Sequence, residues 1–419
     1  MIQRTLRLAL SFALAASMLL GVAPTANAAF NNTPDSTWMT NGQVYAITQV
    51  GNTVYLGGKF KALRQCPPGQ SCGPGSSISS GLLNIGAIDA TTGVGVKTFK
   101  HTVGAPGEKS FVYALAVLDG KLFIGGKFSE VDGQPRLNLA AIDLATNTLD
   151  PDVAPQIGVD ISDRVRGMIA HNDRIYVAGY FTTVNGQVRK KLAAFDSNGN
   201  LDTVWKPRTS GLARTLTTTC DGSSIIAGGA FRKARGSTGT NQDRATLAMF
   251  DATTGELKAW TPDNAEVTSG VNAFDLDRDC TTNRLIVGYG GSNAIYGFDL
   301  SDNFGDILWS LKTGGNVQTV AVRGDRIYFG GHFANVPVQC PGVTGNVKDS
   351  RTRFAVSDLN GCIRQAGSTA PIDGFAPTFS GRFYGPWDIY PNATQLWVGG
   401  QFTDVSGTTQ YMIARFTDA

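Results

Sequence analysis

The sequence predicts an all-β protein built as a seven-bladed β-propeller. A Gly-Gly pair recurs after short apolar runs, at intervals of roughly 40 to 70 residues, and periods of this size are typical of propellers and solenoids. Glycine is abundant, at 51 residues, and only 16% of residues are charged. Helix signals are scarce, so the composition favours short strands joined by tight turns.

The recurring element is an apolar run followed by Gly-Gly, one variable residue and Phe. Its seven copies are Gly57-Gly58-Lys59-Phe60, Gly125-Gly126-Lys127-Phe128, Ala178-Gly179-Tyr180-Phe181, Gly228-Gly229-Ala230-Phe231, the degenerate Gly288-Tyr289-Gly290-Gly291, Gly330-Gly331-His332-Phe333 and Gly399-Gly400-Gln401-Phe402. We expect the glycines to end the second strand of each blade where blades crowd near the axis, because a side chain there would collide with a neighbouring backbone. The Phe is expected to pack between blades.

Residues 112–155 show one complete unit. VYALAVL and KLFIGG are two strands joined by an Asp119-Gly120 hairpin turn. LNLAAID is the third strand, and the unit ends with TLDPDVAP. Seven such units predict a propeller of four-stranded antiparallel blades.

The two ends of the mature chain are expected to meet in the last blade. The last unit stops at Ala419, directly after its third strand, and a spare unit ending lies around Trp38. Residues near 30–41 should therefore complete the last blade as its outer strand, which closes the ring and removes an open sheet edge. Residues 29–419 are predicted to form a single propeller domain.

The Gly-Gly repeats resemble those of the kelch-like propellers of the galactose oxidase central-domain superfamily, and of related repeat proteins secreted by bacteria. The resemblance covers essentially the whole mature chain. The resemblance implies the propeller fold and gives almost no information about function.

Residues 1–28 are predicted to be a cleaved secretory signal peptide. Arg4 and Arg7 precede an apolar stretch, and Ala26-Asn27-Ala28 forms a cleavage site. We expect the mature protein to be secreted or held at the cell surface, as a monomer. No other apolar run approaches the roughly 20 residues of a membrane helix. The net charge is only +3, so nucleic-acid binding has no bulk electrostatic support.

All six cysteines follow the predicted signal, and an even number in an exported protein predicts disulfides. Cys66 and Cys72 flank an insertion in the first unit. Cys220 and Cys280 occupy the same hairpin turn in neighbouring blades, and Cys340 and Cys362 lie within one blade. The predicted pairs are Cys66–Cys72, Cys220–Cys280 and Cys340–Cys362.

The candidate binding residues are those that should surround one mouth of the central channel, where propeller ligands usually bind. The first strands align as V-x-A, and the x residues are Tyr45, Tyr113, Arg166, Arg214, Asn272, Gln318 and Trp387. The variable residues after Gly-Gly, expected on the same face, include Lys59, Lys127, Tyr180, His332 and Gln401. Aromatic rings stack on sugars, and Arg and Lys pair with carboxylate or phosphate. A glycan or anionic polymer would suit this mouth; the alternative is that these side chains only fill the channel.

One stretch has the oxygen spacing of a calcium loop. Asp275, Asp277, Asp279 and Asn283 stand at positions 1, 3, 5 and 9, and Ca²⁺ collects carboxylate and amide oxygens. The alternative is an ordinary polar hairpin turn. No other cofactor is expected.

The sequence favours a binding protein over an enzyme. The HExxH, GxSxG, Walker A and GxGxxG motifs are missing, so no catalytic residue is predicted. The leading hypothesis is an extracellular protein that binds a glycan, an anionic polymer or a protein partner through the mouth. A glycan hydrolase or lyase at the same mouth is the second hypothesis; it needs an acid pair across the ring, with Asp388 or Glu130 a conceivable member. A structural component of the cell envelope is the third.

Overall fold

The computed structural model describes residues 30–65, 78–262, 271–301, 305–338, 340, 348–364 and 372–418. Within these ranges the protein is all-β, with one turn of 3₁₀-helix, η1 (Ile372–Gly374). No helix in them has the length and apolar character to cross a membrane. The predicted signal peptide, Cys66 and Cys72 lie outside the described residues.

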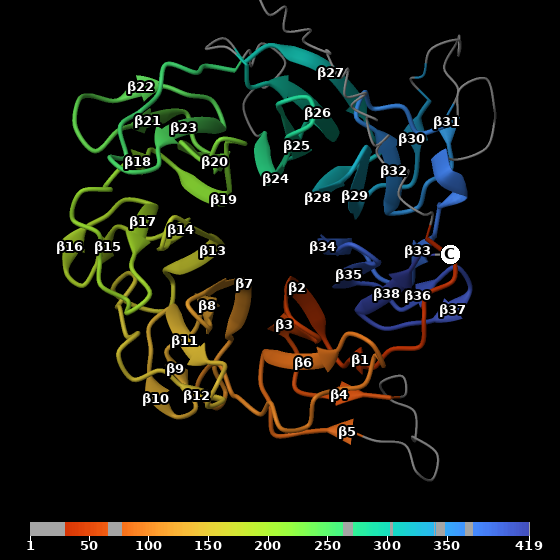
Figure 1. Cartoon of the computed structure of the whole chain (residues 1–419), viewed down its shortest axis with the longest axis horizontal. Coiled ribbons are helices and arrows are strands. Elements are labelled where there is room, and N and C mark those ends of the chain that lie inside the picture. The colour runs from red at the N-terminus through yellow and green to blue at the C-terminus, as the bar shows by residue number, and fades with distance from the viewer. Residues whose placement is uncertain are drawn as a thin grey trace, which may run out of the picture.

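Seven antiparallel sheets repeat one strand order and surround a central axis (Figure 1). The innermost strands are β2 (Gln43–Val50), β7 (Phe111–Leu118), β13 (Arg164–His171), β19 (Leu212–Thr218), β24 (Asn272–Asp279), β28 (Asn316–Arg323) and β34 (Gly385–Pro391). The second strands are β3 (Thr53–Lys59), β8 (Lys121–Lys127), β14 (Arg174–Tyr180), β20 (Ser224–Ala230), β25 (Arg284–Gly290), β29 (Arg326–His332) and β35 (Gln395–Gln401). The third strands are β6 (Ile85–Asp89), β11 (Leu139–Asp143), β17 (Leu192–Phe195), β23 (Leu247–Asp251), β26 (Ala294–Asp299), β32 (Phe354–Asp358) and β38 (Ile413–Thr417). We number these sheets 1 to 7 in chain order.

Among the described residues, the expected fourth strand is present in two of these sheets. Sheet 2 has β12 (Thr148–Leu149) and sheet 5 has β27 (Ile307–Lys312). In sheets 1, 3 and 4 it is reduced to single bridges, Ile88 with Gly95, Phe195 with Leu201 and Phe250 with Leu257. The outer edge of these three sheets is therefore the least regular part of the repeat.

Short strands of two or three residues form small outer ribbons. They are β1 (Met39–Thr40), β4 (Leu63–Arg64), β5 (Ile78–Ser79), β9 (Glu130–Val131), β10 (Gln134–Pro135), β15 (Thr183–Val184), β16 (Gln187–Val188), β18 (Arg208–Thr209), β21 (Lys233–Arg235), β22 (Gln242–Asp243), β30 (Val336–Pro337), β31 (Lys348–Asp349), β33 (Phe379–Ser380), β36 (Asp404–Val405) and β37 (Thr408–Thr409).

Every innermost strand contains one β-bulge at the same place. In sheet 1, Val44 pairs with Gly58 and Ala46 pairs with Gly57, so Tyr45 between them has no partner in the ladder. The residues skipped in this way in sheets 1 to 7 are Tyr45, Tyr113, Arg166, Arg214, Phe274, Gln318 and Trp387. A bulge bends a strand and redirects a side chain, and here it does so once per sheet.

The recurring glycines make room for this bulge. A Cβ on Gly126 would lie 2.0 Å from the carbonyl oxygen of Phe111, which precedes the bulge in the same sheet. A Cβ on Gly125 would lie 2.6 Å from Cγ1 of Val165, in the inner strand of the next sheet. The expected backbone collision thus occurs within the sheet, whereas the neighbouring sheet contributes a side chain. Sheet 5 departs from the pattern, since Tyr289 pairs with Ala273 where the other sheets have the second glycine.

The hydrophobic core lies between the sheets. Each of seven buried clusters combines side chains of two neighbouring sheets. Phe128, after Gly-Gly-Lys in sheet 2, packs in the cluster shared with sheet 1, and Phe181 of sheet 3 packs in the cluster shared with sheet 2. Both rings are fully buried, as expected for a residue that packs between sheets.

Sheet 7 also contacts sheet 1 and the N-terminal segment. Val44 and Trp397 share one cluster, and Gln395 Nε2 donates to the carbonyl oxygen of Ala90. Phe30 bridges to Asp418, and Asp35 N–H donates to the carbonyl oxygen of Arg415 on β38 (2.8 Å). The N-terminal segment pairs with β38 at Asp35 and with the residue after β38 at Phe30. Met39–Thr40 pairs with β4 instead, so the backbone pairing with β38 does not extend over the whole predicted range of 30–41.

Two of the predicted disulfides are present. Cys220–Cys280 joins sheet 4 to sheet 5, and Cys340–Cys362 links two segments that flank β32 in the chain. Disulfides persist in oxidising compartments, so these bonds are consistent with an extracellular protein.

Replacing Gly126 with alanine should strongly destabilise the fold, because its Cβ would collide with backbone that cannot move without breaking the bulge. We expect a loss of roughly 3 kcal/mol or more, measured by chemical or thermal unfolding. Gly120→Ala is the control: its φ is +71° and its Cβ would meet open space, so only the left-handed backbone cost of about 1–2 kcal/mol applies. Equal losses in the two variants would contradict the proposed role of Gly126.

Candidate functional site

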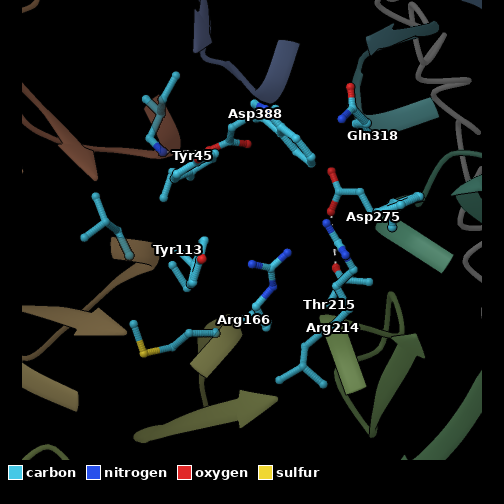
Figure 2. A pocket seen from close by; sticks show the side chains of 17 residues that line it. Tyr45, Tyr113, Arg166, Arg214, Thr215, Asp275, Gln318 and Asp388 are labelled. Atoms are coloured by element: carbon cyan, nitrogen blue, oxygen red, sulfur yellow. Dashed lines mark hydrogen bonds between the residues drawn. The ribbon is translucent and has the colours of Figure 1, made fainter. Parts of the chain in front are cut away.

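A cavity of about 340 Å³ occupies one end of the central channel, and all seven bulge residues line it. In Figure 2 the side chains of Tyr45, Tyr113, Arg166 and Gln318 are arranged around this space. The residues after the bulges complete its wall, among them Thr215, Asp275 and Asp388. The bulge therefore supplies one chemically variable group per sheet to a shared site.

Six of the seven residues predicted from the V-x-A alignment are brought together here. They are Tyr45, Tyr113, Arg166, Arg214, Gln318 and Trp387. The prediction for sheet 5 was wrong: Asn272 pairs with Gly290 where the strand begins, and Phe274 is the bulge residue. Val271-Asn272-Ala273 matches the pattern by letter, but the bulge comes two residues later.

The residues predicted after Gly-Gly form an outer tier at the same end of the strands. Lys59 and His332 are the last residues of β3 and β29, and each pairs with the first residue of its inner strand. Lys59 Nζ lies 5.2 Å from the ring of Phe111, and His332 lies 4.0 Å from that of Phe383. The remaining members, none of which lines the cavity, are Lys127, Tyr180 and Gln401.

Two guanidinium groups meet in the cavity without a carboxylate bound to either. Arg166 Cζ lies 4.1 Å from the ring of Tyr113, and Arg214 Cζ lies 4.0 Å from the ring of Phe274. Within the described part of the chain, neither arginine forms a salt bridge. Burial lowers the pKa of both, and for Arg214 the nearby charge of Arg166 lowers the pKa further, while the negative charge of Asp275 partly opposes this shift. An anion between them would relieve both effects.

Aromatic side chains form the adjoining wall. The ring of Tyr45 lies 5.4 Å from that of Tyr113 and 5.8 Å from that of Trp387. Burial raises the pKa of Tyr45, so its hydroxyl stays protonated at neutral pH. The site thus presents flat apolar surfaces beside its cationic groups, a combination suited to a sugar that carries an acidic group.

Asp275 and Asp388 are acidic groups on the cavity wall, and both also join neighbouring sheets. Asp275 accepts hydrogen bonds from Val320 N–H (3.0 Å) and from the Thr215 hydroxyl (3.2 Å). Asp388 accepts one from Ile47 N–H (2.6 Å), which links sheet 7 to sheet 1. These N–H groups belong to innermost strands, whose free edge faces the channel.

Both carboxyl groups lie deep in the ring, although water reaches them through the cavity. Burial raises the pKa of Asp275 to about 6 and that of Asp388 to about 8, the latter with a contribution from the negative charge of Asp275. At neutral pH Asp388 therefore holds its proton and Asp275 is mostly ionised. With two arginines, the cavity keeps a net positive charge.

The calcium loop suggested by the spacing is not formed. Asp275, Asp277 and Asp279 all lie on the extended strand β24, and each binds backbone N–H groups. Alternate residues of a strand are separated by about 6–7 Å, so these carboxylates cannot converge on one ion. Asn283 lies in the following turn, at φ +53°. In the described ranges, no three His, Cys, Asp or Glu side chains gather to hold a metal.

Two polar atoms at the cavity have no hydrogen-bond partner among the described residues. They are Nε1 of Trp387 and Oε1 of Gln318, both buried from solvent. Buried polar groups are normally paired, so these two atoms are exceptions in the packing around the cavity.

Sequence reasoning missed Phe274 and the wall position of Asp275. The sequence does contain a signal for Phe274. Cys220 and Cys280 are predicted to share one hairpin turn and so align the inner strands of sheets 4 and 5. Arg214 lies six residues before Cys220, and Phe274 lies six residues before Cys280. Asp388, the conceivable acid of the hydrolase hypothesis, does lie on the cavity wall. The aromatic residues Phe383 and Tyr384, which lie beside His332, carry no repeat signal at all.

Comparison with known proteins supports a β-propeller family. The model of a domain of unknown function, DUF5122, described as a beta-propeller, matches residues 118–140 and 172–203. No curated protein matches the chain. Among solved structures, the computationally designed Ika8 protein has 12% sequence identity and a TM-score of 0.48, over 92% of this chain and 100% of the designed one.

Asp388 should make the stability of the protein depend on pH. Its pKa is about 8 in the folded protein and about 3.9 in an unfolded chain, so its contribution to stability is complete at low pH and is lost as pH rises through 8. The melting temperature of the native protein should fall by a few degrees more than that of Asp388→Asn between pH 5.5 and 8.5. The exposed Asp152→Asn is the control and should follow the native profile. Parallel profiles for native protein and Asp388→Asn would contradict this prediction.

Proposed function

We propose that the seven sheets are the blades of one seven-bladed β-propeller, closed where sheet 7 meets sheet 1. The contacts of Phe30 and Asp35 with the edge of β38, and the Asp388–Ile47 hydrogen bond, support closure. The Gly-Gly repeat carries the proposed likeness to the kelch-like propellers. The predicted signal and the two disulfides support a secreted or surface-held protein.

We infer that the protein binds an anionic ligand, with a glycan as the leading class, at the cavity end of the central channel. The observation that carries this proposal is the pair of arginines Arg166 and Arg214. Both guanidinium groups are buried and lie against aromatic rings, and neither forms a salt bridge with a carboxylate among the described residues. Keeping two cations together in this way is costly unless a ligand supplies the opposite charge. Arginine in this setting suits carboxylate, sulfate or phosphate groups.

The alternative that these side chains only fill the channel is less consistent with the cavity. A channel packed by its own side chains would leave no space of about 340 Å³ among the seven bulge residues.

Removing the arginine pair should abolish binding of acidic glycans. We expect Arg166→Gln/Arg214→Gln to lose at least about 30-fold in affinity on an array of acidic and neutral glycans, because buried charge pairs contribute about 2 kcal/mol or more. Lys100→Gln/Lys206→Gln removes the same charge from exposed positions and should bind like the native protein. No retention of any acidic glycan by the native protein, or equal retention by the arginine variant, would overturn the proposal.

A glycan-active hydrolase or lyase is the second candidate, and one observation favours it. Asp275 and Asp388 share the cavity with pKa values that place a proton on one carboxyl and a charge on the other at neutral pH. Acid and base roles on two carboxyls are the pattern of glycoside hydrolysis. Their hydrogen bonds to neighbouring sheets give both groups a structural role as well.

Asp388→Asn separates binding from catalysis. If the protein is an enzyme, this variant should retain the bound glycan and lose at least about 100-fold in the rate of product release, since general acid catalysis contributes 10²–10⁴-fold. Reducing-end and unsaturated-product assays on the native protein and the variant measure this. Absence of any product with the native protein on every glycan that it binds would leave binding as the function.

A further inference from the structure

A second group of aromatic residues lies beside the mouth and is exposed to solvent. Phe383 is 60% exposed and Tyr384 is 42% exposed, in the short loop between β33 and β34. Large exposed aromatic side chains that touch one another are unusual on a soluble surface and commonly mark a binding site. Arg382 precedes them in the same loop and is also exposed.

The loop is anchored at both ends by strand pairing, of Ser380 with Asp404 and of Gly385 with Gln401. Gly381 has φ +92° and Gly385 has φ +76°, backbone conformations that other residues rarely adopt. A Cβ on Gly385 would also lie 2.6 Å from the carbonyl oxygen of Gly331 on β29. The exposed rings of Phe383 and Tyr384, which we call the platform, thus lie between two paired strands.

The rings form an unbroken track from the rim to the arginine pair. Phe383 and Tyr384 are 4.9 Å apart, and Tyr384 and Trp387 are 5.5 Å apart. Trp387 then contacts Tyr45 at 5.8 Å, and Tyr45 contacts Tyr113, which lies against Arg166. The exposed part of the track begins outside the cavity, and its last ring adjoins the cationic end.

We propose that the ligand is an acidic oligosaccharide, with its charged residue held by Arg166 and Arg214 and its following sugar rings stacked on Trp387, Tyr384 and Phe383. This rests on the proposed function, since the arginine pair defines the buried end. A compact anion would need only the cavity. A ligand that extends past the rim accounts for the outer rings, and flat apolar surfaces in series suit successive sugar rings.

The test compares ligands of different length by isothermal titration calorimetry. Galacturonic acid occupies only the charged end, whereas trigalacturonate also reaches the platform. The native protein should bind the trimer at least tenfold more tightly than the monomer. Phe383→Ala/Tyr384→Ala should remove that advantage and leave the affinity for the monomer unchanged, and Tyr384→Phe should keep it because the ring remains. Both exposed positions allow folding, which melting temperatures would verify.

The outcomes separate this inference from the proposed function. Equal affinity for monomer and trimer, or a trimer affinity that the Phe383/Tyr384 variant does not change, would overturn the extended site and leave the arginine site standing. A carrageenan tetrasaccharide, which carries sulfate and no carboxylate, identifies the acidic group: selective binding of either probe with the expected length effect supports the proposal. Binding of neither probe would overturn the acidic saccharide. Binding of aspartate-rich peptides in that case would identify an acidic protein loop as the occupant.

Discussion

One extra residue in each innermost strand, and the glycines opposite it, determine how this protein presents its chemistry. The bulge pushes a backbone carbonyl toward the second strand, and a Cβ on Gly126 would lie 2.0 Å from that oxygen. The preceding glycine leaves space for the side chain of the next sheet, which sets how closely the sheets approach. The bulge and its two glycines therefore let neighbouring sheets pack closely. They also direct one side chain of each sheet into the cavity.

The charges at the cavity follow from this arrangement. Innermost strands leave N–H groups on their free edge, and Asp275 and Asp388 bind such groups on the following sheet. Burial then raises the pKa of both carboxyls, so they cannot fully neutralise Arg166 and Arg214 at neutral pH. The acids that join the sheets therefore share one space with two arginines whose charge they balance only in part, and this is the basis for proposing an anion as the occupant.

Much of this could be predicted from the chain because its repeats carry two kinds of information. The glycine pairs reveal the sheets and the turns, and the variable residue of V-x-A reveals six of the seven residues at the cavity. The prediction failed in sheet 5, where Tyr289 replaces the second glycine and the letter pattern no longer marks the bulge. The spacing of Asp275, Asp277 and Asp279 suggested a calcium loop, because oxygen spacing alone does not distinguish a loop from a strand. Phe383 and Tyr384 lie in a loop with no counterpart in the repeat, so only their contacts in three dimensions reveal them.

The separation between the bulge side chains and the backbone ladder has an evolutionary consequence. Each bulge residue is skipped by the hydrogen-bond register, so exchanging its side chain leaves the pairing of its sheet intact. Seven such positions, one per repeat, can change without altering the strand pairing, although neighbours in contact, such as Tyr113 and Arg166, are expected to change together. Gene copies of a chain like this can acquire new specificities through single codon changes, and tandem duplication supplies more positions of the same kind.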